Sequence, residues 1–217
     1  MMREIRAQIN LEKYVQQMVE LKARLSYLKE KPPSKEDRFS IENAALHIRK
    51  IIELFAFSLM SLQKEEYKKY RNSAGADFLK DWNGRDILNN LANLNPDMFF
   101  KPTDKEIQIQ ADGVRNVQLR DETEVYTIKR LNKLYERCGG VLHVSNPWKD
   151  CNKVESFGGE LPSITKKLLS TFEDQTILVN HWDSVESTVV IVTLTGANGS
   201  PAYHLALGNG NFCFGKV

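Results

Sequence analysis

Residues 122–148 read ETEVYTIKRLNKLYERCGGVLHVSNPW, and this stretch carries the pattern that decides the predicted fold. Its apolar side chains recur at intervals of three and four, which is typical of one buried face of an α-helix. The pattern stops at Gly139-Gly140, where we expect the helix to end, because glycine favours helix C-termini. The predicted buried face carries Val125, Ile128, Leu131, Tyr135 and Cys138, and the opposite face carries Tyr126, Arg130, Lys133 and Arg137.

Chemically versatile side chains gather at the end of this helix. His143 follows Arg137 by six positions, and a turn at Asn146-Pro147-Trp148 comes next. Histidine exchanges protons near neutral pH, and arginine binds phosphate through two parallel hydrogen bonds. We therefore take Arg137 and His143 as candidate catalytic residues. The candidate substrate-binding residues are Tyr126, Arg130, Lys133 and Asn146.

The Arg137-x5-His143 pair, at a helix end in a helix-rich chain, resembles the Arg-x4–6-His signature of the HEPN superfamily. The resemblance covers residues 1–150 and rests on these two residues. It departs from the family pattern at Cys138, where a polar residue is common, and at the Gly-Gly pair inside the motif. The resemblance implies an all-α domain that cleaves RNA without a metal, as a toxin or anti-phage effector. It also implies a homodimer with a site shared between subunits, and an antitoxin or other protein as a possible partner.

RNA cleavage without a metal needs a base for the 2′-hydroxyl, an acid for the leaving oxygen and a cation for the phosphorane. His143 suits the proton transfers and Arg137 the charge, while Arg130 and Lys133 would guide the RNA backbone. The alternative is a non-catalytic helical protein-interaction module, an adaptor or effector subunit. Arg137 would then pair with a carboxylate and His143 would cap a loop.

The composition sets broad limits. The chain has 217 residues and a formal net charge of +2, so it can bury a substantial core but is not strongly basic overall. Basic residues outnumber acidic ones over residues 1–80, and the balance reverses over residues 151–217. Three cysteines without a Cys-x-x-Cys motif indicate a reduced, cytoplasmic protein. No apolar run reaches the ~18 residues of a membrane span, so we expect no membrane partner.

Two long helices are predicted before the central stretch. Residues 3–30 have mixed three/four apolar spacing and stop at Pro32-Pro33; they form either an edge helix or a dimerisation helix. Residues 39–63 form a central helix that is apolar nearly all round, with Ser40 as the expected N-cap. Its charged stripe is Glu42, Arg49 and Glu53, where an Arg49–Glu53 ion pair is the structural interpretation. In the functional alternative these three residues face the Arg137/His143 end and tune it.

β-structure is predicted in two places. Residues 106–119 alternate about an Asp112-Gly113 turn and form a hairpin whose buried face is Ile107, Ile109, Val117 and Leu119. The hairpin must pack on the bundle or join another sheet. After a linker at 156–159, a helix at 160–174 precedes three strands. We predict an α+β fold: a helical bundle with the inserted hairpin (1–150) and a small C-terminal helix-plus-antiparallel-sheet unit (151–217) that can pack on the first.

The sequence lacks the motifs of several common enzyme chemistries. No Walker A sequence, no Gly-x-Gly-x-x-Gly and no Gly-x-Ser-x-Gly is present. Cys138, His143 and Cys151 could in principle ligate zinc, but their spacing matches no common site and a fourth ligand is not nearby. We expect no metal and no cofactor.

Overall fold

The computed structural model describes residues 2–34, 37–94, 100–109, 115–144, 148, 152–180 and 187–208. Within them lie six α-helices, one 3-10 turn and five strands, in the order α1, α2, α3, η1, α4, β1, β2, α5, α6, β3, β4, β5. The predicted α+β, mainly helical fold is confirmed. The helices are Met2–Glu30 (α1), Arg38–Leu62 (α2), Lys64–Ser73 (α3), Gly84–Leu94 (α4), Ile128–Leu142 (α5) and Lys153–Phe172 (α6), and η1 is Phe78–Lys80. The strands are Lys101–Ile109 (β1), Arg115–Leu119 (β2), Asp174–Asn180 (β3), Ser187–Thr193 (β4) and Ala202–Gly208 (β5).

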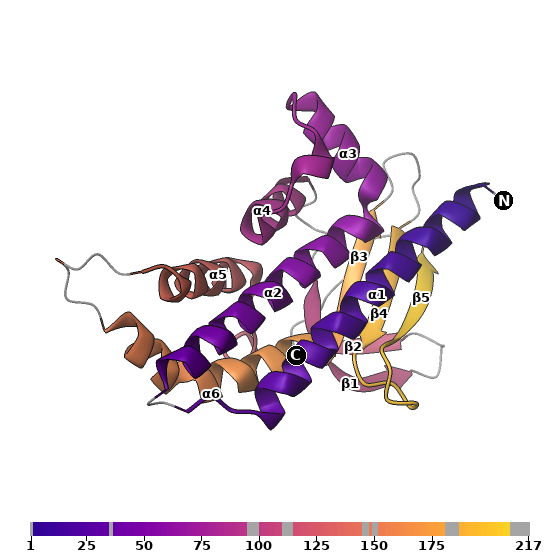
Figure 1. Cartoon of the computed structure of the whole chain (residues 1–217). Coiled ribbons are helices and arrows are strands. Elements are labelled where there is room, and N and C mark those ends of the chain that lie inside the picture. The colour runs from indigo at the N-terminus through magenta and orange to yellow at the C-terminus, as the bar shows by residue number, and fades with distance from the viewer. Residues whose placement is uncertain are drawn as a thin grey trace.

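Helix α2 is the centre of the molecule, as its all-round apolar pattern predicts. It runs diagonally through Figure 1 with α1 alongside, α3 and α4 at one end, and α5 and α6 at the other. Its N-cap is Asp37, whose Oδ1 accepts from the backbone N–H of Phe39 at 3.0 Å, so the expected cap at Ser40 is wrong. An aspartate caps as well as a serine, and the helix begins one turn earlier than its apolar pattern. The buried residues of α2 are Ile41, Ala44, Ala45, Ile48, Ile51, Ile52, Leu54, Phe55, Ala56, Ser58 and Leu59.

Helix α1 uses its apolar stripe inside its own chain. Its side chains from Tyr14 to Leu28 that follow the three/four spacing are almost fully buried, and Tyr14 is completely buried, which raises the pKa of its phenol. The helix also crosses the sheet, where Lys22 Nζ donates to the carbonyl oxygen of Gly199 and Met18 Sδ accepts from Gln175. Figure 1 shows α1 passing in front of β3, β4 and β5. The stripe therefore holds α1 to α2 and the sheet.

The predicted hairpin joins the C-terminal strands in one sheet, with strand order β2-β1-β3-β4-β5 and antiparallel neighbours. Within the hairpin, Ile107 pairs with Val117 and Thr103 with Leu119, and the register shifts between the two pairs. The Asp112-Gly113 turn lies outside the described residues, as do the side chains of Ile107, Ile109 and Val117. Strand β1 reaches β3 through Lys101–Thr176 and Pro102–Gln175 pairs. The sheet thus contains strands from both sides of residue 150.

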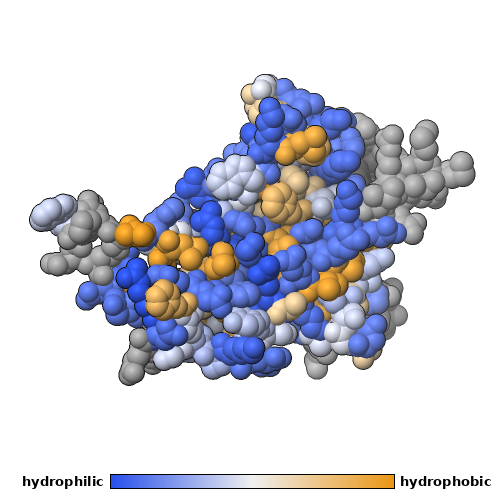
Figure 2. Space-filling model, viewed as in Figure 1, coloured by the Kyte–Doolittle hydropathy of each residue, from blue (hydrophilic) through white to orange (hydrophobic). Residues whose placement is uncertain are grey.

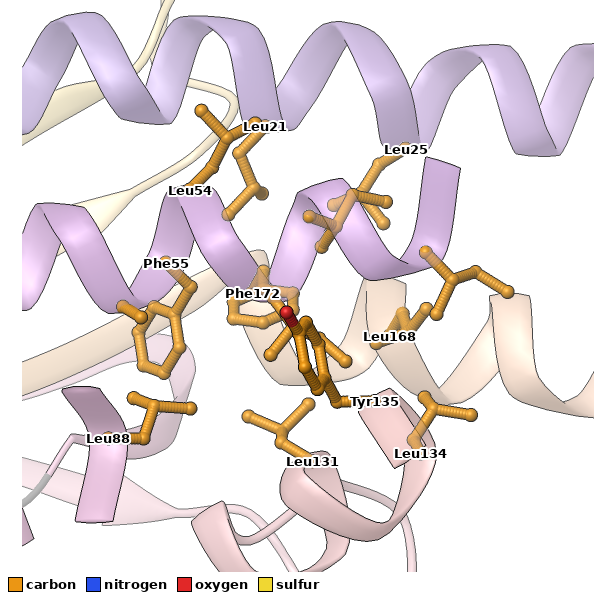
Figure 3. Close-up of a cluster of buried hydrophobic side chains, with 14 of the residues drawn as sticks. Leu21, Leu25, Leu54, Phe55, Leu88, Leu131, Leu134, Tyr135, Leu168 and Phe172 are labelled. Carbon is orange, nitrogen blue, oxygen red and sulfur yellow. The ribbon is translucent and has the colours of Figure 1, made fainter. Parts of the chain in front are cut away.

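A shared apolar core connects the helices to this sheet. Phe55 of α2 lies 4.5 Å from the Phe100 ring and 5.0 Å from the Phe172 ring, between centroids, in edge-on contacts. Burial of such rings is among the largest favourable terms in a core. Figure 3 shows labelled side chains of α1, α2, α4, α5 and α6 converging here, with the phenolic oxygen of Tyr135 directed at α2. The helical end that carries the candidate site is consequently fixed to the rest of the molecule.

Candidate functional site: the groove between α5 and α6

Helix α5 presents the candidate residues, but it lies further along the chain than predicted: Val125 and Tyr126, expected within it, precede its first residue, Ile128. Thr127 caps it, with Oγ1 accepting from Arg130 N. The helix does not end at Gly139-Gly140 but continues to Leu142, and His143 follows as its C-cap residue. Gly139 is buried, and a Cβ there would lie 3.1 Å from Arg49 Nη1. The glycine therefore serves close packing against α2 rather than chain termination.

A groove of about 530 Å³ lies between α5 and α6, next to this helix end. It brings basic side chains from two helices to one opening, together with apolar surface from both. At the left of Figure 2, over α5 and α6, strongly hydrophilic and hydrophobic residues alternate on the surface. The residues that line the groove are Lys133, Glu136, Arg137, Gly140, Val141, Lys153, Ser156 and Phe157.

Arg137 is engaged by a carboxylate of α6. Its Nη2 donates to Oε1 of Glu160 at 2.8 Å and its Nη1 to Oε2 at 3.0 Å, so the pairing is bidentate. The guanidinium carbon also lies 5.5 Å from the centroid of the Phe157 ring. Both charged side chains are about half exposed, at 45% and 47%. A half-exposed ion pair contributes little net free energy to folding, so another anion could replace Glu160 as the partner of Arg137.

His143 stands at the exposed end of α5. Its backbone N–H donates to the Gly139 carbonyl oxygen at 3.1 Å, and its side chain is open to solvent. Between described residues no hydrogen bond or ion pair joins His143 to Arg137. The two candidates thus share a helix end, with Arg137 in the groove and His143 beyond it.

Of the four predicted substrate-binding residues, one lines the groove. Lys133 does so, one turn before Arg137. Tyr126 is half-buried: its backbone N–H donates to Thr171 Oγ1, Lys167 Nζ lies over its ring, and burial raises the pKa of its phenol. Arg130 Nη1 donates to the carbonyl oxygen of Glu122, next to the helix start. Asn146 lies outside the described residues.

The charged stripe of α2 divides into two separate pairs. The Arg49–Glu53 ion pair is confirmed, with Nε and Oε1 3.2 Å apart. Tyr135 of α5 completes it, because its hydroxyl donates to Glu53 at 2.7 Å and accepts from Arg49 Nη2 at 2.6 Å. This environment, chiefly burial, raises the pKa of Tyr135 to about 12. Glu42 instead pairs with Arg38, one turn earlier. Among the described contacts of these three residues, only that of Arg49 Nη1 reaches Gly139, near the end of α5.

Cys138 points into the core and not into the groove. Burial raises the pKa of its thiol to about 12, although Arg137 and Arg49 act in the opposite direction. Of the other two zinc ligands considered, His143 is exposed and Cys151 lies outside the described residues. Among the residues that the structure describes, no group of three His, Cys, Asp or Glu side chains is arranged to hold a metal ion.

Sequence reasoning missed the contribution of α6. Residues 156–159 were expected to form a linker, but α6 begins at Lys153 and runs through them, burying Phe157 and Gly158. The helical signal was present, because apolar residues keep the three/four spacing back across the glycines. Those residues are Val154, Phe157, Leu161, Ile164 and Leu168. Consequently Lys153, Ser156 and Glu160 enter the site although no motif marked them.

Comparison with known proteins identified no relative of this chain. No protein-family model matches the sequence, and neither a curated protein nor a solved structure is significantly similar to it. No helix within the described residues is both long enough and apolar enough to cross a membrane.

Proposed function

We propose that this protein cleaves RNA without a metal ion, with Arg137 and His143 as the catalytic residues. The observation that carries the proposal is the position of Arg137 in an open groove beside Lys133 and Lys153. Three cations against one carboxylate, Glu136, leave the groove lining positive, which favours a polyanion, and the bidentate geometry of arginine suits a phosphate. The HEPN-like Arg-x5-His spacing supports the same assignment.

The proposed reaction is transfer of the phosphoryl group to the neighbouring 2′-oxygen. Neutral His143 accepts the 2′-hydroxyl proton as the 2′-oxygen bonds to phosphorus, and the bond from phosphorus to the 5′-oxygen breaks. The 5′-oxygen takes a proton from a second imidazolium or from water. Arg137 compensates the charge on the phosphorane oxygens. The products are a 2′,3′-cyclic phosphate and a 5′-hydroxyl, with no change of oxidation state.

Glu160 has a defined role in this proposal. In the free protein it occupies the two donors of Arg137 that a phosphate needs. Because the pair is half exposed, its loss costs little, and RNA can displace the carboxylate. Glu160 thus competes with weak anions for Arg137, whereas a polyanion that also binds Lys133 and Lys153 can displace it.

A second copy of the chain would complete the site. Leu142, Val144 and Trp148, at and beyond the end of α5, are exposed by 36%, 93% and 93%. We propose that this apolar end contributes to a two-fold interface that brings two His143 side chains together. Light scattering coupled to gel filtration tests it: a strict monomer at tens of micromolar would contradict a shared site. A cytoplasmic protein, toxin or anti-phage effector with an antitoxin partner, would fit this activity.

One observation favours a second candidate function. Arg137 is already paired bidentately with Glu160, which is what a non-catalytic helical protein-interaction module predicts. In that case the groove docks a protein, and its phenylalanine and valine supply the apolar contact.

The deciding experiment is RNA cleavage in excess EDTA. We expect wild-type protein to cleave, and His143→Ala to reduce the rate about 10²–10⁴-fold, because the proton-transfer group is lost. Arg137→Ala should cost about 10²–10³-fold. Lys133→Ala and Lys153→Ala should instead weaken binding and its salt dependence.

Two matched controls accompany these variants. Arg38→Ala removes an exposed, ion-paired arginine that does not line the groove, and His204→Ala removes an exposed histidine on β5. Both should cleave like wild type, and all variants must unfold at similar temperatures. RNA left intact by wild-type protein under every condition would contradict the proposal and favour the interaction module.

A further inference from the structure

A second cavity, of about 460 Å³, opens where η1 and α4 meet α3. This volume is within the usual range of small-ligand sites, about 300–1,000 Å³. Its lining is almost entirely polar apart from one aromatic ring. The lining residues are Arg71, Lys80, Asp81, Trp82, Asn83, Asp86, Asn89 and Asn90.

The floor of this cavity is a fixed hydrogen-bonded unit. Asp81 accepts from Arg71 Nη2 at 2.7 Å and from the hydroxyl of Tyr67 at 2.8 Å. Tyr67 is fully buried and in turn accepts from Asn90 Nδ2 at 3.3 Å. Arg71 and Asp81 neutralise each other, as do Arg85 and Asp86 beside them. The charges in the cavity interior are therefore paired, and a nearly neutral interior does not suit a phosphate.

The rim offers one aromatic face and one cation. Trp82 is 69% exposed although it is a large hydrophobic residue, and it stands at the cavity opening. Lys80 lines the same opening and has no ion-pair partner among the described residues. A stacking surface beside a positive charge is the combination with which proteins hold a single-stranded nucleotide, base on the ring and phosphate on the cation.

The asparagines supply edge-recognition groups. Asn83 Oδ1 accepts from the backbone of Arg85 and Asp86, and Asn89 Oδ1 accepts from Asn132, so both keep their amide N–H groups for a ligand. Asn90 donates to Tyr67 and keeps its carbonyl oxygen. Two donors and an acceptor beside an aromatic ring match the edge of an unpaired base, because amides pair with base edges in this way.

This cavity adjoins the α5–α6 groove across one helical seam. Arg85 Nη1 of α4 donates to Glu136 Oε1 of α5 at 2.7 Å, and Asn132 Nδ2 of α5 donates to Asn89 Oδ1 of α4 at 2.7 Å. Glu136 lines the groove that holds Arg137, and Asn89 lines the polar cavity. A single nucleic-acid strand lying across α4 and α5 would therefore contact both the polar cavity and the groove.

We propose that the Trp82 cavity binds an unpaired base of single-stranded RNA, as a subsite next to the cleavage groove. The subsite rests on the proposed function for the identity of its ligand. Trp82 stacks on the base, the asparagines contact its edge, and Lys80 holds the adjoining phosphate. Duplex RNA is excluded, because a paired base cannot leave its stack to reach the ring.

The test uses a fluorescein-labelled single-stranded DNA 12-mer, which lacks the 2′-hydroxyl and so cannot be cleaved. In anisotropy titrations we expect Trp82→Ala to weaken binding about 5- to 100-fold, and Trp82→Phe to keep most of the affinity. Leu79→Ala is the matched control, because Leu79 lies three positions before Trp82 and is 77% exposed but does not line the cavity. Trp82→Leu is a second variant that keeps bulk without the aromatic face, should the alanine variant unfold.

The outcomes separate the two proposals. The subsite proposal is overturned if Trp82→Ala and Trp82→Leu bind the single strand as tightly as wild type does. It is also overturned if these variants lose as much affinity for a duplex as for the single strand, or if the wild-type protein does not bind the single strand. If the protein cleaves RNA but its Trp82 variants bind the single strand as wild type does, the subsite is overturned and the proposed function is not. Binding that depends on Trp82, in a protein that cuts no RNA, overturns the proposed function and leaves the subsite.

Discussion

The guanidinium of Arg137 is held by both carboxylate oxygens of Glu160, at 2.8 and 3.0 Å, across the groove between α5 and α6. The two residues lie 23 positions apart in the sequence, one on α5 and the other on α6. The pair is half exposed, so its contribution to folding is small and its main effect is on what Arg137 can bind.

The first prediction therefore concerns Glu160. Glu160→Gln should tighten binding of a single-stranded oligonucleotide by about three- to tenfold, because a competing carboxylate is removed and Arg137 is released. The free energy of unfolding should change by less than about 1 kcal/mol. Anisotropy and urea titrations measure the two effects. Glu155→Gln, on the same helix but outside the groove, is the control, and an affinity unchanged by Glu160→Gln would contradict phosphate binding at Arg137.

The second prediction compares two adjacent glycines of α6. A Cβ on Gly158 would meet Cδ1 of Ile41 at 2.6 Å and Cγ1 at 3.1 Å, whereas one on Gly159 meets nothing within 4 Å. Gly158→Ala should destabilise the protein by about 1–3 kcal/mol through overpacking. Gly159→Ala should stabilise it by about 0.5–1 kcal/mol, because alanine favours a helix interior. Thermal or urea unfolding decides, and a gain for Gly158→Ala would show that α2 and α6 are not in this contact.

The third prediction concerns Cys138. Burial raises the pKa of its thiol to about 12, so at pH 8 the thiol is protonated and shielded. In a Cys151→Ser/Cys213→Ser background, a thiol reagent such as dithionitrobenzoate should react with the native protein only as fast as it unfolds, and at once in urea. Rapid native labelling would mean that the helix end opens frequently.

The fourth prediction is a pH dependence from His47. Its ring stacks on Tyr27 at 4.4 Å, and its Nδ1 lies 3.2 Å from Arg24 Nη1, which requires the neutral imidazole as acceptor. Burial, then Arg24 and Lys50, lower the pKa of His47 below 6.5 in the folded state. The unfolded chain thus binds the proton more readily, and stability present above pH 6.5 is lost as the pH falls through the folded-state pKa.

The measurement is urea unfolding between pH 8 and pH 5. The stability advantage of wild type over His47→Gln should narrow as the pH falls, because glutamine does not titrate. His204→Gln, at an exposed site on β5, is the matched control substitution. An advantage that grows on acidification would mean that protonated His47 is stabilised in the folded state.

The sequence by itself determined the local elements. Three/four spacing identified α1, α2 and α5, and alternation identified the hairpin strands and β3 to β5. These features depend on neighbours three or four positions away, or on alternate residues, so the chain encodes them before it packs. The Arg49–Glu53 pair was predictable for the same reason.

Only the tertiary structure decided what the glycine pairs do and what Arg137 contacts. Gly139 and Gly158 lie inside their helices on the side that packs against α2, where a Cβ would lie 3.1 Å from Arg49 Nη1 at the first position and 2.6 Å from Ile41 Cδ1 at the second. A glycine's intrinsic preference for helix ends amounts to about 1 kcal/mol, and burial of a helix face outweighs it. Once residues 156–159 are helical, Glu160 comes to face Arg137 and the groove exists. That pairing across 23 residues has no local signal, because it depends on where two helices meet.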